Sequence, residues 1–179
     1  VRDVTYDVYV VDEPVMPNAF AAPGGKLILF SSVIDKADGP DEVAGILSHE
    51  MAHIELHHPM RGVMRDFGLT IALQMMFGSD AGAAQMIGAL GQLSYSRADE
   101  AEADKIGQEI LHAADIDPKS LISFFEKLPE FDGEGRFSKI MGYLSTHPRN
   151  DDRIAELEKY DNEKTYEPVL NKADWKALQ

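Results

Sequence analysis

The chain contains no cysteine, and this absence limits the chemistry that it can use. Without thiols there can be neither a disulfide nor a thiolate ligand, so a metal site has to be built from imidazole and carboxylate groups. A nucleophilic mechanism must also work without sulfur. The same absence leaves the redox compartment of the protein open.

Basic residues and long apolar runs are also scarce. The 17 Lys and Arg residues face 31 Asp and Glu residues, which gives a formal net charge of -14 and a field that repels nucleic acid. A membrane-spanning helix needs about 20 mostly apolar residues, but Asp80 divides the most apolar region of the chain. No transmembrane helix is therefore predicted. The Met-rich segment 67–93 is expected to be a buried core helix, with peripheral membrane association as the alternative.

The domain organisation follows from length and composition. The 179 residues, 44% of them hydrophobic and 27% charged, suit a single globular domain spanning residues 1–179. We find no internal repeat and no Gly-, Pro- or Ser-rich linker. The first residues, VRDVTYDVYVV, lack the features of a signal peptide. The sequence does not predict an oligomeric state.

The hydrophobic patterns predict an α+β fold that is mostly helical, with a small N-terminal sheet. Residues 4–11 alternate and residues 26–31 form a second strand-like run, while residues 17–20 suggest a loop or an edge strand. Helices are expected afterwards, and Pro59 should stop the first of them at His58. The predicted helices cover about residues 40–58, 62–77, 81–113, 118–128 and 149–160, and the tail after residue 161 is left unassigned.

The sequence His49-Glu50-Met51-Ala52-His53 lies inside the first predicted helix. Its i, i+4 spacing places both imidazoles on one helical face, where they can bind a single metal ion. Glu50 is displaced around the helix from His49, so it can act on a water molecule as a general base without becoming a ligand. On this motif alone, a pair of helix-surface histidines is the competing interpretation.

A catalytic zinc ion needs a third protein ligand and an open position for water. The metzincin pattern would require glycine and histidine where the chain has Leu56 and Pro59, so that class is excluded. Because cysteine is absent, the remaining candidate is a carboxylate on another helix. Glu100, with Asp104 one turn later, supplies such a pattern, which resembles the third-ligand helix of gluzincins.

Three motifs together resemble the HtpX-like and CAAX-prenyl-protease-like zinc metallopeptidase family, in its soluble bacterial envelope branch. They are HEMAH, SRADEAEADKIG and STHPRNDDRI, in this order, and Asn18-Ala19-Phe20 before PGGKLILF also matches. The resemblance covers most of the chain. It implies a gluzincin-type metallopeptidase domain in which the small sheet lies beside the active-site helix, and Glu100 is the third zinc ligand.

The same resemblance implies roles for other residues. Asp104 is expected to orient a ligating histidine through its free ring nitrogen, although a solvated helix face is the plain alternative. His147 and Arg153 resemble the late histidine and arginine that stabilise the oxyanion, and Asn18 resembles a residue that binds substrate backbone. For Asn18, a simple turn residue is the alternative.

His147 admits two further interpretations. A neutral imidazole is a good fourth zinc ligand, so His147 could close the metal site in a latent state, or it could simply begin a helix. The other histidines receive no metal role. His57 is expected at a frayed helix end, and His58 and His112 at ordinary surface or helix-end positions.

The function that follows is a zinc-dependent metalloendopeptidase with one zinc ion per chain and peptide or unfolded protein as substrate. By resemblance, it acts in quality control in the bacterial periplasm or cell envelope, with a lipid anchor as an option for the full-length protein. The alternative is a zinc-containing chaperone or binding module with latent or lost protease activity, which the presence of Glu50 disfavours. A purely structural zinc site is a third hypothesis, and only His147 could complete it.

Overall fold

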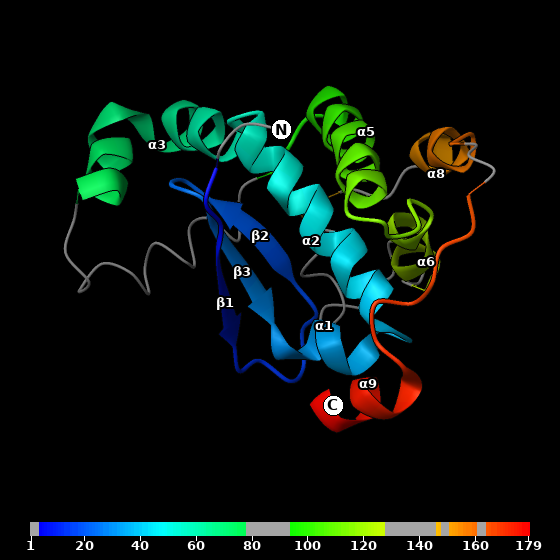
Figure 1. Cartoon of the computed structure of the whole chain (residues 1–179). Helices are drawn as coiled ribbons and strands as arrows, with labels where there is room; N and C mark the ends of the chain where they lie inside the picture. The colour runs from blue at the N-terminus through cyan, green and yellow to red at the C-terminus, as the bar shows by residue number, and fades with distance from the viewer. Residues whose placement is uncertain (1–3, 78–93, 128–145, 148–150, 161–163) are drawn as a thin grey trace, which may run out of the picture.

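The structure, a computed structural model, describes residues 4–77, 94–127, 146–147, 151–160 and 164–179 (Figure 1). It is mostly helical with a small N-terminal sheet, which confirms the predicted α+β class. The strands are β1 (Asp7–Val11), β2 (Ala19–Ala22) and β3 (Lys26–Phe30). The helices are α1 (Ser31–Lys36), α2 (Pro40–Glu55), α3 (His58–Phe77), α5 (Arg97–Ala113), α6 (Ser120–Lys127), α8 (Asp151–Glu158) and α9 (Lys172–Leu178).

The sheet has the strand order β1-β3-β2, with β1 parallel and β2 antiparallel to the central strand β3. β2 is the edge strand that residues 17–20 suggested, and all four of its residues are buried. The turn into β3 contains Gly24 and Gly25 at φ 85° and 79°, a backbone region that favours glycine. A Cβ atom on Gly25 would also lie 2.3 Å from the carbonyl oxygen of Thr5, so this position has no room for a side chain.

α2 is the helix around which the other elements pack. It begins at Pro40, which suits the first helical position, and Asp41 and Glu42 favour the positive end of the helix dipole. Its neighbours include β2, α5 and α6, and Figure 1 shows α2 running between the sheet and α5. The main core cluster therefore draws on all these layers and contains Ala19, Leu29, Val33, Ile46, Leu111, Leu121, Ile122 and Leu157.

Two helix boundaries differ from the sequence predictions. α2 ends at Glu55 rather than His58, because His57 adopts a left-handed conformation with φ 58° that breaks the helix. Pro59 therefore does not stop α2; it lies in the first turn of α3, where its missing N–H group has no helical partner to lose. α5 begins at Arg97 instead of continuing from residue 81, and residues 81–93 lie outside the described residues.

The remaining elements differ in smaller ways. The strand-like run 26–31 ends at Phe30, because Ser31 opens the unpredicted helix α1. The unassigned tail contains α9, capped by the Asn171 side chain, which accepts hydrogen bonds from two backbone N–H groups. Across the described ranges, no helix combines the length and apolar character needed to cross a membrane. Of the Met-rich segment 67–93, residues 67–77 end α3 and residues 78–93 are not described.

The close contact between α2 and α6 generates a stability prediction. A Cβ atom on Gly45 would lie 2.7 Å from the backbone oxygen of Ser120, so Gly45→Ala must push the two helices apart. We expect a loss of about 1–3 kcal/mol in the free energy of unfolding, measured by urea denaturation. Glu109→Ala, at an exposed position of α5, is the control and should stay within about 0.5 kcal/mol. Equal stability of the two variants would contradict the prediction.

Candidate metal centre

The central part of α2 carries three buried ionisable side chains within about one helical turn. His49, Glu50 and His53 are each 0% exposed, which is costly for such groups unless they are paired or bind a metal. The Nε2 atoms of His49 and His53 lie 3.0 Å apart, as the i, i+4 spacing predicts. The structure therefore brings the two predicted histidine ligands together.

α5 brings the carboxylate of Glu100 to these histidines. Glu100 Oε2 lies 3.4 Å from His49 Nε2, and Oε1 lies 3.4 Å from His53 Nε2. The position of Glu100 is fixed by a capping box one residue earlier, in which Ser96 and Asp99 each accept a hydrogen bond from the other's backbone N–H group. Farther along, Gly107 allows close packing, because a Cβ atom there would lie 3.3 Å from the backbone nitrogen of His49.

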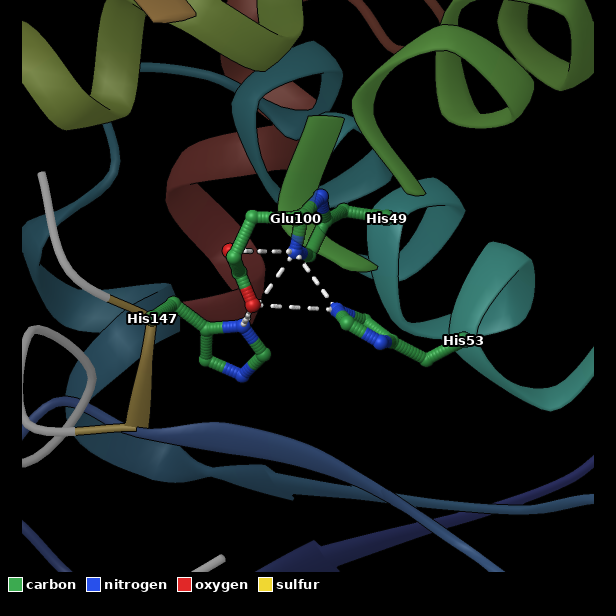
Figure 2. Close-up of side chains that lie close together, drawn as sticks. All are labelled: His49, His53, Glu100 and His147. Carbon is green, nitrogen blue, oxygen red and sulfur yellow. Dashed lines mark hydrogen bonds and ion pairs between the residues drawn. The ribbon is translucent and has the colours of Figure 1, made fainter. Parts of the chain in front are cut away.

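His147 completes the group from outside the helices (Figure 2). Its Nδ1 atom lies 3.0 Å from Glu100 Oε1 and 3.2 Å from His49 Nε2. Its other nitrogen, Nε2, lies 3.2 Å from Glu50 Oε1. The imidazole of His147 thus lies between the histidine and glutamate ligand candidates and the candidate general base.

The donor atoms of His49, His53, Glu100 and His147 fit a zinc ion. Four atoms around zinc at its usual distances of about 2.0–2.1 Å form a tetrahedron with edges of about 3.3 Å. With Oε1 as the Glu100 donor, four of the six separations lie between 3.0 and 3.4 Å, and all four donors lie within 4.8 Å of one another. Three imidazoles and one carboxylate, all buried, also form a donor set that zinc prefers. Metal dependence of the site therefore agrees with its geometry.

Burial and the neighbouring charges together shift the pKa values of the two α2 histidines. Burial lowers the pKa of His53 well below its ordinary value, which keeps its imidazole neutral. For His49, burial acts in the same direction, but the carboxylates of Asp104 and Glu100 outweigh it and raise the pKa to about 9. Burial would raise the pKa of Glu100, yet the adjacent His147, His49 and His53 hold it far below its usual range.

Asp104 lies behind His49, on the side away from the other ligand candidates. Its Oδ1 atom is 3.0 Å from His49 Nδ1, while His49 Nε2 faces the metal cluster. A hydrogen bond from Nδ1 to this carboxylate leaves the lone pair on Nε2, which is the arrangement a ligating histidine needs. Burial raises the pKa of Asp104, but hydrogen bonds with Arg153 and His49 reverse this and lower it.

Arg153, in α8, connects two buried carboxylates of α5. Its Nε and Nη2 atoms donate to the two oxygens of Asp104 at 2.7 and 2.8 Å, and Nη1 lies 2.7 Å from Glu100 Oε2. Arg153 is 9% exposed, so these contacts are shielded from water. The guanidinium group is thus engaged with the carboxylates that support the metal cluster.

Two further side chains contact His53, and the sequence interpretation gave neither of them a role. The ring of Tyr95 stacks on His53, with ring centroids 4.1 Å apart and an angle of 25° between the planes. His58 is buried at the first residue of α3, with Nδ1 2.8 Å from His53 Nδ1, so of the two expected positions the helix end is correct and the surface is wrong. The tight turn at His57 returns the chain onto His53, and this turn has no clear sequence signal.

The remaining predicted positions lie apart from the cluster. Asn18 is buried just before β2, where its backbone oxygen accepts a hydrogen bond from Phe30, and its side-chain Oδ1 has no hydrogen-bond partner within the described residues. No described contact joins Asn18 to the metal ligands. His57 is exposed, as is His112, which pairs with the Tyr166 hydroxyl at 2.8 Å.

The fold and the cluster define a metallopeptidase domain, with an HExxH helix and a carboxylate from a second helix. Residues 1–161 match the family described as Peptidase family M48, and the chain belongs to this family. This is the family of HtpX-like and CAAX-prenyl-protease-like enzymes that the three motifs resemble, so the sequence interpretation is confirmed.

Curated relatives of the chain include proteases from mitochondria and bacteria. The mitochondrial metalloendopeptidase OMA1 of Schizosaccharomyces pombe is 30% identical over 166 residues, which cover 88% of this chain and 47% of that protein. The beta-barrel assembly-enhancing protease of Escherichia coli K12 is 31% identical over 154 residues, covering 78% of this chain and 31% of that protein. The chain therefore spans about half, or less, of the length of these relatives.

The contacts of Arg153 predict that it is essential for stability. Arg153→Met leaves two buried carboxylates without their cation, and we expect a loss of about 3–5 kcal/mol in the free energy of unfolding of the metal-free protein. Urea denaturation in the presence of a chelator measures this. Arg61→Met is the control, because the exposed Arg61–Asp99 pair should contribute only about 0–1 kcal/mol. A similarly small loss for Arg153→Met would contradict the expectation.

Proposed function

We propose that this chain is the catalytic domain of a zinc-dependent metalloendopeptidase that hydrolyses peptide bonds in unfolded or unassembled proteins. The observation that carries the proposal is the convergence of His49, His53 and Glu100 beside the buried carboxylate of Glu50. A structural zinc site would not require a buried glutamate next to its ligands. A peptidase requires one, because the attacking water must lose a proton.

Zinc is the proposed cofactor, with one ion per chain, held by His49, His53 and Glu100. The support is the nitrogen-rich donor set and donor separations that suit a small tetrahedral ion. When bound, the zinc ion polarises the substrate carbonyl and increases the acidity of water. Asp104 holds His49 in the ligating tautomer, and Arg153 holds Glu100 and Asp104 in place.

Glu50 is the proposed general base and then the general acid. Its carboxylate accepts a proton from water while the water oxygen attacks the carbonyl carbon of the peptide. The same proton passes to the amide nitrogen as the carbon–nitrogen bond breaks, so the products are a carboxylate and an amine. No covalent intermediate with the protein forms. Burial of Glu50 excludes bulk water from the place where the proton moves.

The role of Glu50 can be tested by removing its basicity alone. Glu50→Gln keeps the size of the side chain, and we expect cleavage of casein by the zinc-loaded protein to fall by about 10²–10⁴-fold, with zinc binding retained. Glu109→Gln, the same change at an exposed position of α5, should leave cleavage unchanged. Chelation of the metal should abolish cleavage in both the wild type and this control. Full activity of Glu50→Gln would refute the proposed mechanism.

His147 is proposed to close the site in the arrangement that the structure shows. Its Nδ1 atom lies among the ligand candidates, and its Nε2 atom lies against Glu50, so the ring fills the space that water and substrate require. This contact supports the latent state rather than a helix-start position. In such a state, His147 has to move before substrate can bind.

Removing the His147 ring should therefore increase the basal rate. We expect His147→Ala, saturated with zinc, to cleave casein severalfold faster than the wild type, because water reaches the site without a prior displacement. His112→Ala is the matched control at an exposed histidine and should have no effect. A fall of about 10²-fold or more would instead assign His147 to oxyanion stabilisation, the role implied by resemblance.

Arg153 and Asn18 also have proposed roles. The resemblance assigns Arg153 to the oxyanion, but its contacts with Glu100 and Asp104 favour a positioning role instead. Asn18 remains a proposed substrate-binding residue. Its support is its place just before β2 and the buried Oδ1 atom, which has no hydrogen-bond partner among the described residues.

The biological setting is proposed from the relatives. Their names describe a protease that enhances β-barrel assembly and a mitochondrial metalloendopeptidase, so quality control in the bacterial periplasm or envelope is the setting that we favour. A peripheral membrane contact through segment 67–93, and a lipid anchor on the full-length protein, are parts of the same proposal.

We also propose one domain over residues 1–179, supported by contacts of the Gln179 side chain with the backbone oxygens of Ile34 and Ala37.

A further inference from the structure

The contact between His53 and His58 requires one hydrogen between two ring nitrogens. The Nδ1 atoms of the two imidazoles lie 2.8 Å apart, a distance at which one nitrogen must donate and the other accept. Both rings are buried, so water does not replace either partner. A neutral imidazole carries one hydrogen, so the direction of this hydrogen bond decides whether the Nε2 atom of each ring carries the hydrogen or the lone pair.

We infer that His58 is a positioning residue for the metal ligand His53, accepting its Nδ1–H and thereby directing its Nε2 lone pair toward the metal. The inference rests on the proposed function, because it takes His53 as a ligand through Nε2. Nε2 of His53 faces His49 and Glu100, so the hydrogen of a neutral ring has to be on Nδ1. His58 thus does for His53 what Asp104 does for His49.

If His58 accepts a hydrogen bond at Nδ1, the single hydrogen of its neutral ring is on Nε2. Its Nε2 atom makes no hydrogen bond within the described residues, but Asp99 Oδ1 at 3.4 Å and Glu102 Oε2 at 3.7 Å place two carboxylates close to it. Asp99 is itself fixed, because its Oδ2 atom accepts hydrogen bonds from the backbone N–H and the hydroxyl of Ser96. The chain of contacts therefore runs from His53 in α2, through His58 in α3, to the capping box of α5.

The same three residues could suggest a second metal site, since His58, Asp99 and Glu102 offer clustered donor atoms. A cation bound at His58 Nε2 needs the lone pair there, which moves the ring hydrogen to Nδ1. His58 would then donate to His53, and the hydrogen of neutral His53 would be on Nε2, among the ligands. With neutral imidazoles, a metal at His58 therefore excludes His53 as a ligand, and the structure favours the positioning role.

Two variants of similar shape separate the acceptor from the packing. His58→Asn places its amide oxygen near the position of the Nδ1 atom and keeps the acceptor, whereas His58→Leu has the same branching without an acceptor. We expect His58→Leu to bind zinc about 10–100-fold more weakly than the wild type, and His58→Asn to bind close to wild type, in competition with a chromophoric chelator. His112→Leu is the control at a histidine away from the site. Urea denaturation of the metal-free proteins provides a further control. The free energy of unfolding of His58→Leu should fall by less than its free energy of zinc binding.

The outcomes distinguish this inference from its alternatives. Equal zinc affinity of His58→Asn and His58→Leu, whether weakened or unchanged, would overturn it, and so would a second zinc equivalent in the wild type that both variants lose. If His58→Leu does not fold, His58→Gln replaces it, because its longer amide moves the acceptor away from the Nδ1 position. Zinc affinity is measured without substrate, so a wild type that binds zinc but cleaves nothing rejects the proposed function and not the role of His58.

Discussion

The arrangement of this domain depends on one electrostatic constraint, the burial of acceptor atoms that face one another. Nitrogen atoms of His49 and His53 and the carboxylate of Glu100 lie 3.0–3.4 Å apart in the interior. Lone pairs so close together repel unless a proton or a cation lies between them. The surrounding residues compensate the carboxylate charge, and a metal ion satisfies the remaining acceptors.

The compensation comes from several elements, and this explains why distant parts of the chain meet at one place. α5 contributes Glu100 and Asp104, α8 contributes Arg153, and the short segment at residues 146–147 contributes His147. Glycines at the α2–α6 and α2–α5 contacts let these helices approach closely, because a Cβ atom at either position would meet a neighbouring backbone at 3.3 Å or less. Packing and charge therefore specify the same arrangement.

The sequence predicts the site better than the boundaries of the helices that carry it. HEMAH has a fixed geometry on any helix, so the proximity of His49 to His53 followed from spacing alone. The proximity of Glu100 depends on tertiary packing, and only the resemblance to a family assigned it as a ligand. His58 was missed because the left-handed turn at His57 carries no glycine or asparagine to signal it. The capping box of Ser96 and Asp99 could be predicted from the pattern S-x-x-D before an acidic helix. It marks the start of α5, which hydrophobic periodicity alone placed too early in the chain.

The position within its helix of Glu100, the proposed third ligand, has a consequence for how the metal would be retained. Glu100 lies in the first turn of α5, whereas His49 and His53 lie in the interior of α2. Helix ends open locally at a lower free energy than helix centres, so a ligand in a first turn can leave while the core stays folded. The rate of metal loss should then follow the opening of that one turn, as hydrogen exchange would report it, rather than global unfolding. The capping box and Arg153 both act against this opening, which makes them determinants of metal retention as well as of structure.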